Sequence, residues 1–371
     1  MPDLPNRTRW AIIGAGFAGS ATAWALGRAG LGPGVIVEQE AIYGFHASGK
    51  NAAMLRLAEE DPLILTLALR SYRHLQALPA APDPLVGSGG GLTLADASLV
   101  HELEASHKVY RQARLETTLL GAAEARARFP LLRNVRFDTA LFCPSEGVID
   151  IHGLLTLYLR QARDAGFTLH TGCRVDDLLI EGGRVTGFET TRGAVRADVV
   201  VDASGAWAGH LGRATHPLPL TPFRRHLFVT GPLAGGRVPS PFAWHQDGAF
   251  YFRPEGDGLL MSPCDQTPMP AGDPPTDPAA LDSLAEKLLQ WAPNLTDLPI
   301  RRSWACLRTF APDVHPIIGP DPKLAGLFHV SGLDGFGAGT SAAVGELAAT
   351  LLTGRMPDWI AASEVSPGRF A

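Results

Sequence analysis

The sequence contains little cysteine and no cysteine pair of the kind that binds metal. Its cysteines are Cys143, Cys173, Cys264 and Cys306, and none belongs to a CxxC motif, which excludes both a zinc knuckle and a redox dithiol. We therefore predict no metal site and no disulfide, as is usual in a reducing compartment. The first residues, MPDLPNRTRW, lack the apolar region and cleavage site of a secretory signal, so we predict a cytoplasmic protein.

Basic charge and long apolar runs are also scarce. The formal net charge is -5, the pI is about 6.2 and no run of Lys or Arg occurs, so a nucleic-acid partner is not expected. Glycines, Arg28 and Pro33 interrupt the apolar stretch 10–37 before it reaches the ~20 residues that cross a bilayer, which indicates no integral membrane segment. The 46% of hydrophobic residues instead supports a core divided between two domains.

Both ends of the chain show the order strand, glycine turn, helix. WAIIGAGFAGSATAWALGRAG predicts this order at the start, where VIVEQE adds a second strand, and GLFHVSGLDGFGAGTSAAVGELAATLLTG repeats it at the end. Between them we expect helices at 62–78 and after PSEGVIDIHG, and a β-meander over 168–205 that leads into a central parallel strand. Residues 216–304 contain further strands and one helix, LDSLAEKLLQWA, which predicts a second, sheet-based domain.

A dinucleotide-binding motif lies at the first glycine turn. Gly14, Gly16 and Gly19 form GAGFAG between a predicted strand and a predicted helix, and Glu38 ends the next strand. We expect Gly14 to make the turn, Gly16 to let backbone amides approach a pyrophosphate, and Gly19 to pack the helix against the strand. Glu38 would accept hydrogen bonds from ribose hydroxyls and disfavours a 2'-phosphate, but it does not separate NAD from FAD.

Two further segments favour a flavin. HASGKNAA predicts a short polar turn that opens a helix, and GLDGFGAGTSAA predicts a glycine-rich turn that opens the last helix. The N-terminus of a helix attracts negative charge, so the last helix can stabilise an anionic reduced flavin ring.

Blocks spread along nearly the whole chain carry a family resemblance: GAGFAG, HASGKNAA, CPSEGVIDIHGL, ADVVVDASGAWA, SWACLRTFAPDVHPIIGPD, GLFHVSG and GFGAGTS. On these blocks the chain resembles the D-amino-acid oxidase superfamily of FAD-dependent oxidoreductases, especially D-arginine dehydrogenase, glycine oxidase and the sarcosine oxidases. The resemblance implies an α/β (α+β) two-domain fold, in which a Rossmann-type FAD-binding domain with a parallel sheet and a β-meander is interleaved with a sheet-based substrate domain. We place the FAD-binding domain at 1–85, 148–215 and 305–371, and the substrate-binding domain at 86–147 and 216–304.

The resemblance also implies which residues contact FAD. Most belong to the two glycine-rich turns, to HASGKNAA and to the end of ADVVVDASGAWA. The expected cofactor-binding residues are Gly14, Gly16, Phe17, Ala18, Gly19, Glu38, Gln39, Ser48, Gly49, Lys50, Ala52, Ala53, Met54, Val175, Ala203, Gly205, Trp207, Cys306, Arg308, Gly335, Phe336, Gly337, Ala338, Gly339 and Thr340.

On the substrate side, the resemblance implies that Arg308 clamps the substrate carboxylate, because a guanidinium matches two carboxylate oxygens and stays charged. Arg225 and Tyr251 match further substrate-side positions, with Arg224 as an alternative to Arg225. Tyr251 and His46 are candidates to bind the amine or to accept its proton. His46 can equally be a turn residue that caps the following helix.

The reaction implied is the oxidation of a D-amino acid by hydride transfer from Cα to flavin N5, which gives an imino acid that hydrolyses to a keto acid and ammonia. Quinone and O2 are both open as electron acceptor. The alternatives are an N-methyl amino acid oxidase with FAD linked covalently to Cys306, an FAD-dependent 2-hydroxyacid dehydrogenase, and a flavin-binding module without turnover. An NAD-only dehydrogenase would leave HASGKNAA and GFGAGTS without a role.

The chain departs from D-arginine dehydrogenase in the wall of the substrate pocket. Met54 occupies a position where that enzyme carries histidine, and Glu59 occupies one where it carries tyrosine. Gly91 or a neighbour replaces an acidic residue of that enzyme. We therefore do not expect arginine as substrate, although Glu59 or Glu60 can restore a carboxylate.

Other departures concern the flavin. Cys306 matches the cysteine that binds flavin covalently in sarcosine oxidases, but it can also be a buried structural thiol. Leu260 replaces the lysine that those oxidases use for oxygen activation, which favours a dehydrogenase or a slow oxidase. Asp334 stands where glycine is usual, so we expect altered contacts at the flavin edge.

Overall fold

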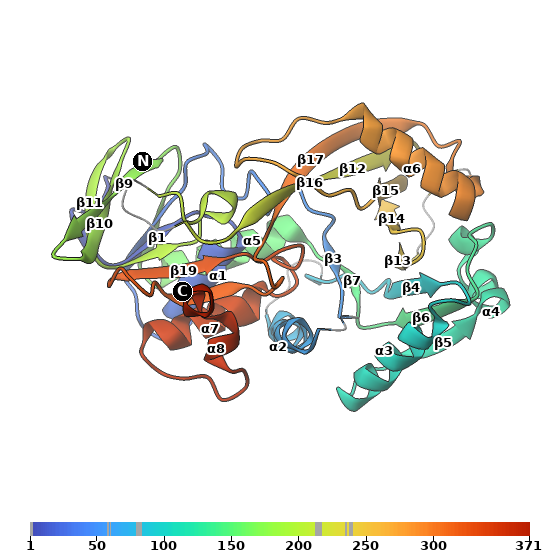
Figure 1. The fold of residues 1–371 in the computed structure, drawn as a ribbon, viewed down its shortest axis with the longest axis horizontal. Coiled ribbons are helices and arrows are strands. Elements are labelled where there is room, and N and C mark those ends of the chain that lie inside the picture. Colours follow the sequence, from blue (N-terminus) through green and yellow to red (C-terminus); the bar gives the residue numbers. More distant parts are fainter. Residues whose placement is uncertain are drawn as a thin grey trace.

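The computed structural model of the chain describes residues 3–57, 59, 61–78, 84–211, 217–233, 236 and 240–371. Two large β-sheets lie side by side, and both termini belong to the half that contains the first sheet (Figure 1). This mixed α/β architecture confirms the predicted fold class. None of the helices in the described ranges is both long and apolar enough to cross a membrane.

The first sheet has eight strands and a parallel centre. Its main path runs through β18 (Ile317–Pro320), β19 (Leu327–Ser331), β11 (Gly193–Asp202), β1 (Arg7–Ile13), β2 (Gly34–Val37) and β8 (Phe167–His170). The antiparallel strands β9 (Val175–Glu181) and β10 (Arg184–Thr190) form the predicted β-meander, which leads into β11. Because the central strands are buried, their segments read as continuous apolar runs.

The helices of this half are α1 (Phe17–Arg28), α2 (Pro62–Ala77), α5 (Ile151–Asp164), α7 (Ser341–Leu352) and α8 (Ala362–Val365). α1 packs against both α5 and α7. Small residues allow the close approach to α7, since a Cβ on Gly345 would lie 2.3 Å from the carbonyl oxygen of Ala21. On the other side, the Trp24 indole donates to Gln161 Oε1 at 2.7 Å.

The second sheet has nine strands. Its path runs through β16 (Thr267–Pro268), β12 (Thr221–Thr230), β15 (Gly258–Ser262), β14 (Phe250–Glu255), β13 (Phe242–His245), β4 (Gly91–Ala95), β6 (Thr139–Cys143) and β5 (Thr118–Gly121), and β17 (Ile300–Phe310) pairs with β12. Helices α3 (Val100–Gln112), α4 (Ala122–Arg128) and α6 (Pro278–Trp291) belong to the same half (Figure 1). A core rich in phenylalanine and leucine joins this sheet to α6.

The remaining elements are short. β3 (Met54–Leu55) pairs with β7 (Gly147–Val148), and the single turns are η1 (Pro130–Leu132), η2 (Gly205–Trp207), η3 (Pro293–Leu295) and η4 (Pro367–Phe370). β17 continues in the second sheet to its last residue, so the predicted boundary at 305 falls inside a strand. The division into domains stays a proposal.

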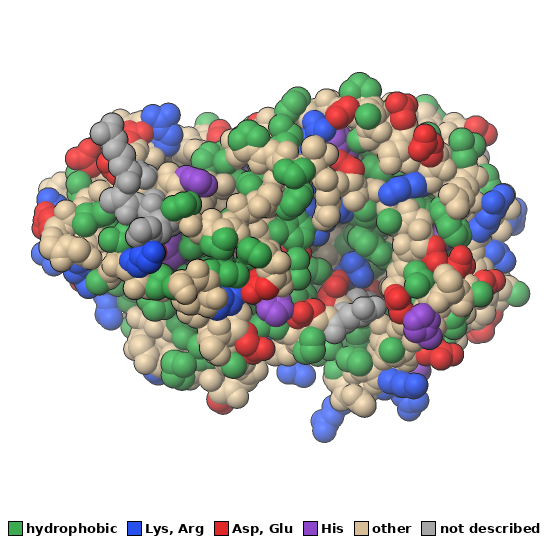
Figure 2. Space-filling view, viewed as in Figure 1, with side chains coloured by type: hydrophobic (Ala, Val, Ile, Leu, Met, Phe, Trp, Pro, Cys, Tyr) green, Lys and Arg blue, Asp and Glu red, His purple; other side chains and the backbone are tan. Residues whose placement is uncertain are grey.

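Acidic and basic side chains are interspersed on the face in Figure 2.

One predicted element is wrong. HASGKNAA does not open a helix: residues 43–51 form turns, and the chain then extends into β3. The Asn51 amide donates to the carbonyl oxygens of Ala47 and Ser48, while its oxygen accepts from the Ala53 amide. Ala53 also has a φ of 59°. A polar side chain that bonds the local backbone competes with helix formation, and the left-handed residue turns the chain away.

Candidate active site

A cavity of about 390 Å³ runs from the first glycine turn to the second sheet. Its walls come from the ends of β1, β2 and β11, the 43–54 segment, the turn before α7, and the strands β12, β13, β14 and β17. The carboxyl ends of parallel strands are the usual place for a ligand in an open α/β sheet. The cavity therefore joins a nucleotide-type edge to the surface of an antiparallel sheet.

The glycine turn between β1 and α1 has room for glycine alone. Gly14 has a φ of +100°, and a Cβ there would lie 2.5 Å from the carbonyl oxygen of Ala203. A Cβ on Gly19 would lie 2.0 Å from the Gly14 carbonyl oxygen, so this glycine sets the distance between helix and turn. A Cβ on Gly16 would meet Ser48 Oγ at 2.8 Å. The turn brings the amino end of α1 directly to the cavity, as a pyrophosphate site requires.

Glu38 follows β2 and is only 9% exposed. Its Oε2 accepts from the Ala15 amide at 2.9 Å and its Oε1 accepts from the Glu40 amide at 3.0 Å. These bonds fix the carboxylate at the cavity edge, and each oxygen keeps a further lone pair for a ribose hydroxyl. Gln39 lines the cavity beside it.

The structure places most of the other predicted cofactor residues in this cavity wall. Ser48 Oγ accepts from the Phe17 amide at 2.9 Å, so the 43–51 turns close over the start of α1. The following residues also line the cavity: Ala18, Lys50, Ala52, Ala53, Met54, Val175, Ala203, Gly205, Trp207, Gly335, Phe336, Gly337, Ala338, Gly339 and Thr340. Gly49 is not among the lining residues, but a Cβ there would lie 2.4 Å from the Gly44 carbonyl oxygen, so it is needed for the turn.

These features fit FAD. The glycine cradle, the amino ends of α1 and α7, and the carboxylate of Glu38 supply the groups that a dinucleotide needs, in one continuous space. Asp273 belongs to the same wall and forms an ion pair with Lys50, which also lies 4.6 Å from the centre of the Phe45 ring.

His46 lines the same cavity as the other three predicted catalytic residues. Its Nε2 is 2.9 Å from Glu40 Oε1, and its ring lies 4.7 Å from that of Trp207. Its contacts thus tie it to the segment after β2 and to η2, and no helix follows that it could cap. The structure thus places His46 in the wall of the same cavity as Arg225, Tyr251 and Arg308, and its contacts with Glu40 and Trp207 hold it there.

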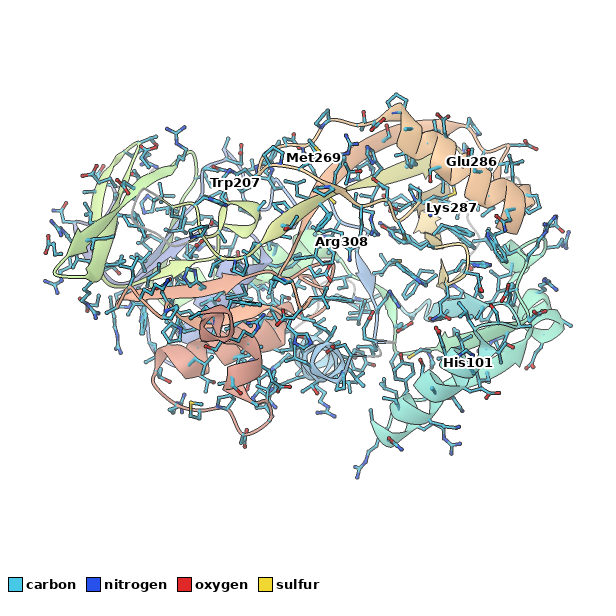
Figure 3. The ribbon with its side chains drawn as sticks, viewed as in Figure 1. His101, Trp207, Met269, Glu286, Lys287 and Arg308 are labelled. Atoms are coloured by element: carbon cyan, nitrogen blue, oxygen red, sulfur yellow. The ribbon has the colours of Figure 1, made fainter. Side chains whose placement is uncertain are left out.

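Arg225 and Arg308 lie on one face of the β12–β17 pair. Arg225 is directly opposite Cys306, and Phe223 is opposite Arg308. Because side chains alternate along a strand, Cys306 and Arg308 project on the face that Arg225 shares. Arg308 lies at the centre of the molecule, between the two sheets (Figure 3). A regular antiparallel register thus places both cations in the cavity.

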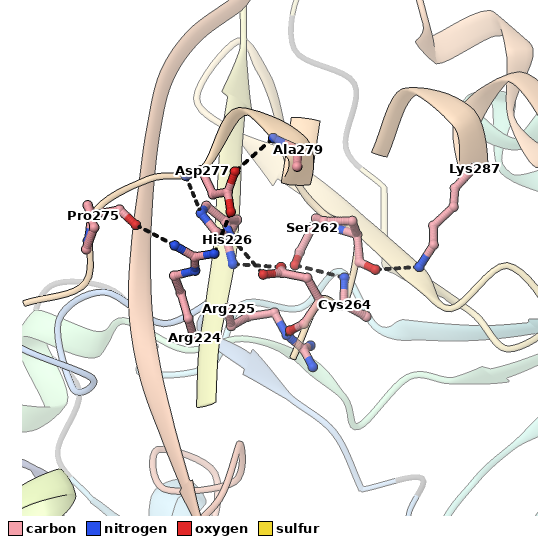
Figure 4. A network of polar contacts seen from close by, with 11 residues as sticks. Arg224, Arg225, His226, Ser262, Cys264, Pro275, Asp277, Ala279 and Lys287 are labelled. Atoms are coloured by element: carbon pink, nitrogen blue, oxygen red, sulfur yellow. Dashed lines mark hydrogen bonds and ion pairs between the residues drawn. The ribbon is translucent and has the colours of Figure 1, made fainter. Parts of the chain in front are cut away.

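Arg224 points the other way. Its Nη2 donates to Asp277 Oδ2 at 2.7 Å, whereas Arg225 Nε donates to the Asp265 carbonyl oxygen at 2.7 Å (Figure 4). His226 binds the carboxylate of Asp265 through its amide and its Nδ1. Of the two neighbouring arginines, only Arg225 lines the cavity. Within the described residues, no carboxylate forms an ion pair with Arg225.

Tyr251 is 4% exposed and faces the same space from β14. Burial raises the pKa of its hydroxyl to about 12, so the group is protonated at neutral pH, which favours hydrogen bonding over proton acceptance as its role. Its ring stacks on Trp244 at 5.5 Å, and the Arg56 guanidinium lies 4.2 Å from the Trp244 ring centre on β13. Arg56 and Trp244 also line the cavity, and sequence reasoning missed both. Trp244 could have been found only by pairing its strand with that of Tyr251, because the two residues are opposite each other on β13 and β14.

Arg308 already has a carboxylate partner. Its Nη2 lies 2.9 Å from Asp334 Oδ1, and the Asp334 side chain is 8% exposed. Asp334 has a φ of 54°, and the neighbouring Gly335 is so close that a Cβ there would lie 2.1 Å from Arg308 Nη2. Burial, and then the charge of Arg225, lower the pKa of Arg308, while burial raises the pKa of Asp334. The departure at position 334 thus changes the site itself.

Cys306 is a buried thiol in an apolar patch with Leu227, Tyr251 and Leu260. Burial raises its pKa to about 11, which keeps it protonated and therefore weakly nucleophilic. Met54 packs against the same patch.

The proposed replacement carboxylates lie elsewhere. Glu59 lies 3.4 Å from Arg56 Nη1 and lines a second, smaller cavity rather than the main one, and Glu60 lies outside the described residues. Gly91 faces Glu146, whose Oε2 would lie 2.0 Å from an added Cβ.

The fold and the site define a flavin-dependent oxidoreductase. A family model described as DAO, FAD dependent oxidoreductase, matches residues 9–351. The chain belongs to this family, and FAD is its cofactor.

Individual relatives are distant. The mitochondrial sarcosine dehydrogenase of Mus musculus is 24% identical over 95% of this chain and 40% of its own length. A glycine oxidase of Pseudomonas aeruginosa is 32% identical over 52% of each protein. The chain therefore spans about half of such relatives or less.

Solved structures show the same fold over nearly the whole chain. L-proline dehydrogenase from P. horikoshii superposes with a TM-score of 0.86 at 23% identity and covers 99% of this chain and 98% of that one. Glycine oxidase from Geobacillus kaustophilus gives a TM-score of 0.83 at 24% identity, over 95% and 96% of the two chains.

Proposed function

We propose that the chain oxidises the Cα–N bond of a small amino acid, with a D-amino acid as the first substrate class. The observation that supports this most directly is the continuous cavity. The glycine turn before α1 lines one part of it, and the buried Arg225, the half-buried Arg308 and the buried Tyr251 line another. FAD, when bound, supplies the two-electron acceptor for the hydride from Cα.

The chain's own residues would orient the substrate. Arg225 is close enough to Arg308 for its charge to lower the pKa of Arg308, and together they would form a site for one carboxylate. Tyr251 can donate its hydroxyl proton to a carboxylate or an amine nitrogen. Holding the carboxylate fixes the Cα hydrogen in one direction, which is the main contribution that positioning makes to such a reaction.

The wall of the cavity favours a small, uncharged side chain. Met54, Leu227 and Trp244 provide apolar surface on the substrate side. Arg56 and Arg225 would repel a second cation there, so an arginine-like side chain is disfavoured.

An N-methyl amino acid is the second candidate. The sarcosine dehydrogenases and dimethylglycine dehydrogenases match 95–100% of this chain, and the apolar patch can receive an N-methyl group as well as a small side chain. Leu260, which is fully buried in that patch, leaves no ammonium group there to promote reaction with O2. We therefore propose a dehydrogenase or slow oxidase, with a quinone and O2 both open as electron acceptor.

The test is the visible spectrum of the purified protein during anaerobic addition of glycine, sarcosine, D- and L-alanine, D- and L-proline, and lactate. Bleaching by D-alanine but not L-alanine is the expected result. Fastest bleaching by sarcosine would move the assignment to N-methyl amino acids, and bleaching by lactate alone would indicate a 2-hydroxyacid dehydrogenase. If no compound bleaches the flavin, the proposal is wrong.

Acid denaturation of the same sample tests the flavin linkage. Because the Cys306 thiol is protonated and buried, we expect FAD in the supernatant, with the same result for Cys306→Ala. Flavin that stays in the pellet of the unmodified protein and moves to the supernatant in Cys306→Ala would establish a thioether instead.

A further inference from the structure

Arg308 and Asp334 form an ion pair in the cavity, so the site contains one positive and one negative group, as the binding of a zwitterionic amino acid requires. Asp334 accepts from Arg308 Nη2 at 2.9 Å, and both residues line the cavity. The Asp334 amide donates to the Thr309 carbonyl oxygen at 3.1 Å, which fixes the turn before α7 against β17. The carboxylate is therefore held beside the guanidinium by the fold and not by a flexible side chain.

We propose that Asp334 receives the ammonium group of the substrate and removes its proton before the hydride leaves Cα. This inference rests on the proposed function. A carboxylate that bridges Arg225 and Arg308 has Asp334 at its side, because Asp334 is bonded to one of the two guanidinium groups. The ammonium nitrogen of an α-amino acid is only two bonds from the carboxylate carbon. A zwitterion thus finds a cationic and an anionic partner in adjacent positions.

The chemistry balances with the groups named. The Asp334 carboxylate takes one N–H proton and becomes a carboxylic acid, which frees the lone pair of the nitrogen. The Cα–H bond then breaks, its electron pair leaves with the hydrogen as hydride to FAD, and the nitrogen lone pair forms the second C–N bond. The substrate loses two electrons, the cofactor gains them, and the product is an imino acid.

The surroundings of Asp334 suit a proton acceptor. The charged groups that act on it are Arg308 from β17 and Arg225 from β12, and both lower the pKa of Asp334, while burial raises it more strongly. Tyr251 faces the same cluster from β14 and remains neutral because its own pKa is about 12. An acceptor whose pKa is raised toward that of its donor removes a proton more readily from an ammonium ion.

The first experiment compares Asp334→Asn with the unmodified holoenzyme, using the amino acid that reduces the flavin fastest in the panel above. A general base contributes about 10²–10⁴-fold to rate, so we expect the anaerobic reduction rate of the variant to fall at least 100-fold at pH 7. The loss should shrink as the pH approaches the pKa of the free amine, where the substrate arrives already deprotonated. Asp313→Asn removes another carboxylate that pairs with an arginine, Arg369, outside the cavity, and should keep the original pH profile.

The second experiment measures binding by calorimetry with sarcosine and with methoxyacetate, in which an ether oxygen replaces the amine. In Asp334→Asn, sarcosine should bind about 10-fold more weakly, because the contact with its ammonium group is lost. Methoxyacetate should bind about 10-fold more tightly, because a negative charge beside Arg308 is removed. An Asp334 that only neutralises Arg308 would give tighter binding of both.

The outcomes separate the two proposals. If the unmodified protein is reduced by an amino acid but Asp334→Asn loses rate equally at every pH, the role of Asp334 is wrong and the proposed function stands. If no amino acid reduces the flavin, both fail. Should the variant not fold, proton uptake when methoxyacetate binds to the unmodified protein is the measure: uptake supports Asp334 as the acceptor, and its absence contradicts it.

Discussion

At the scale of single residues, two consecutive arginines of β12 have opposite surroundings. Arg225 faces the cavity and is 5% exposed, whereas Arg224 forms an ion pair with Asp277 on the other face. The sequence places the two next to each other, and only the family resemblance favours Arg225 over Arg224. Strand alternation makes the choice, because only one of the two can share a face with Arg308.

This difference gives a prediction with a matched control. Arg225→Lys replaces a planar, forked donor by a single ammonium group, and a hydrogen bond to a charged group is worth about 1.5–3 kcal/mol. We expect the dissociation constant of the substrate or of acetate to rise about 10–100-fold, measured by titration of the flavin spectrum.

Arg224→Lys is the control and should change that constant less than about twofold, since Arg224 and its partner Asp277 lie outside the cavity. Equal effects of the two substitutions would contradict the assignment of Arg225 to the carboxylate.

At the scale of the elements, the contact between α1 and α7 connects the two ends of the chain. Ala21 and Gly345 meet so closely that no Cβ fits at 345. α1 begins at the first glycine turn and α7 begins at the second, so their contact fixes both amino ends relative to the cavity.

We therefore predict that Gly345→Ala lowers the free energy of unfolding by about 1–3 kcal/mol, because an added methyl group in a packed interface forces the helices apart. Urea unfolding measures the change, and weaker FAD retention should accompany it. Gly121→Ala makes the same chemical change where no atom lies within 4 Å, and it should cost less than about 0.5 kcal/mol. A Gly345 variant as stable as the Gly121 variant would show that the helices can separate freely.

At the scale of the whole molecule, the buried pair His329–Asp202 and the half-buried pairs of Glu346 join segments that are distant in sequence. His329 is 1% exposed and lies 2.9 Å from Asp321 and 3.5 Å from Asp202, and these carboxylates raise its pKa to about 9 against the effect of burial. Glu346 of α7 lies against Arg70 and His74 of α2, and these partners lower its pKa to about 2. His329 therefore titrates above the neutral range and Glu346 below it.

Stability should consequently decline on both sides of a central pH range. The contribution of His329 is complete below pH 6.5, its ordinary pKa, and is lost as the pH rises through about 9. The contribution of Glu346 is complete above 4.5 and is lost as the pH falls through about 2. Urea unfolding at a series of pH values measures both.

His329→Gln should flatten the alkaline side of that profile, while His101→Gln, at an exposed residue of α3, should leave it unchanged. An unchanged alkaline slope in His329→Gln would contradict the role of this cluster.

The sequence by itself determined the local order of strand, glycine turn and helix at both ends of the chain. Local order needs only hydrophobic runs and glycines at positions where no side chain fits, and both are visible in the letters. It failed at HASGKNAA, because the side chain of Asn51 and the left-handed backbone of Ala53 favour turns over a helix.

Only the tertiary structure decided which chemical groups share the site. The register of β12 against β17 puts Arg225 and not Arg224 on the face of Arg308, the contacts with Glu40 and Trp207 hold His46 in the cavity wall, and the turn before α7 brings Asp334 to Arg308. Strand register and long-range packing depend on residues far apart in the chain, so no local pattern encodes them.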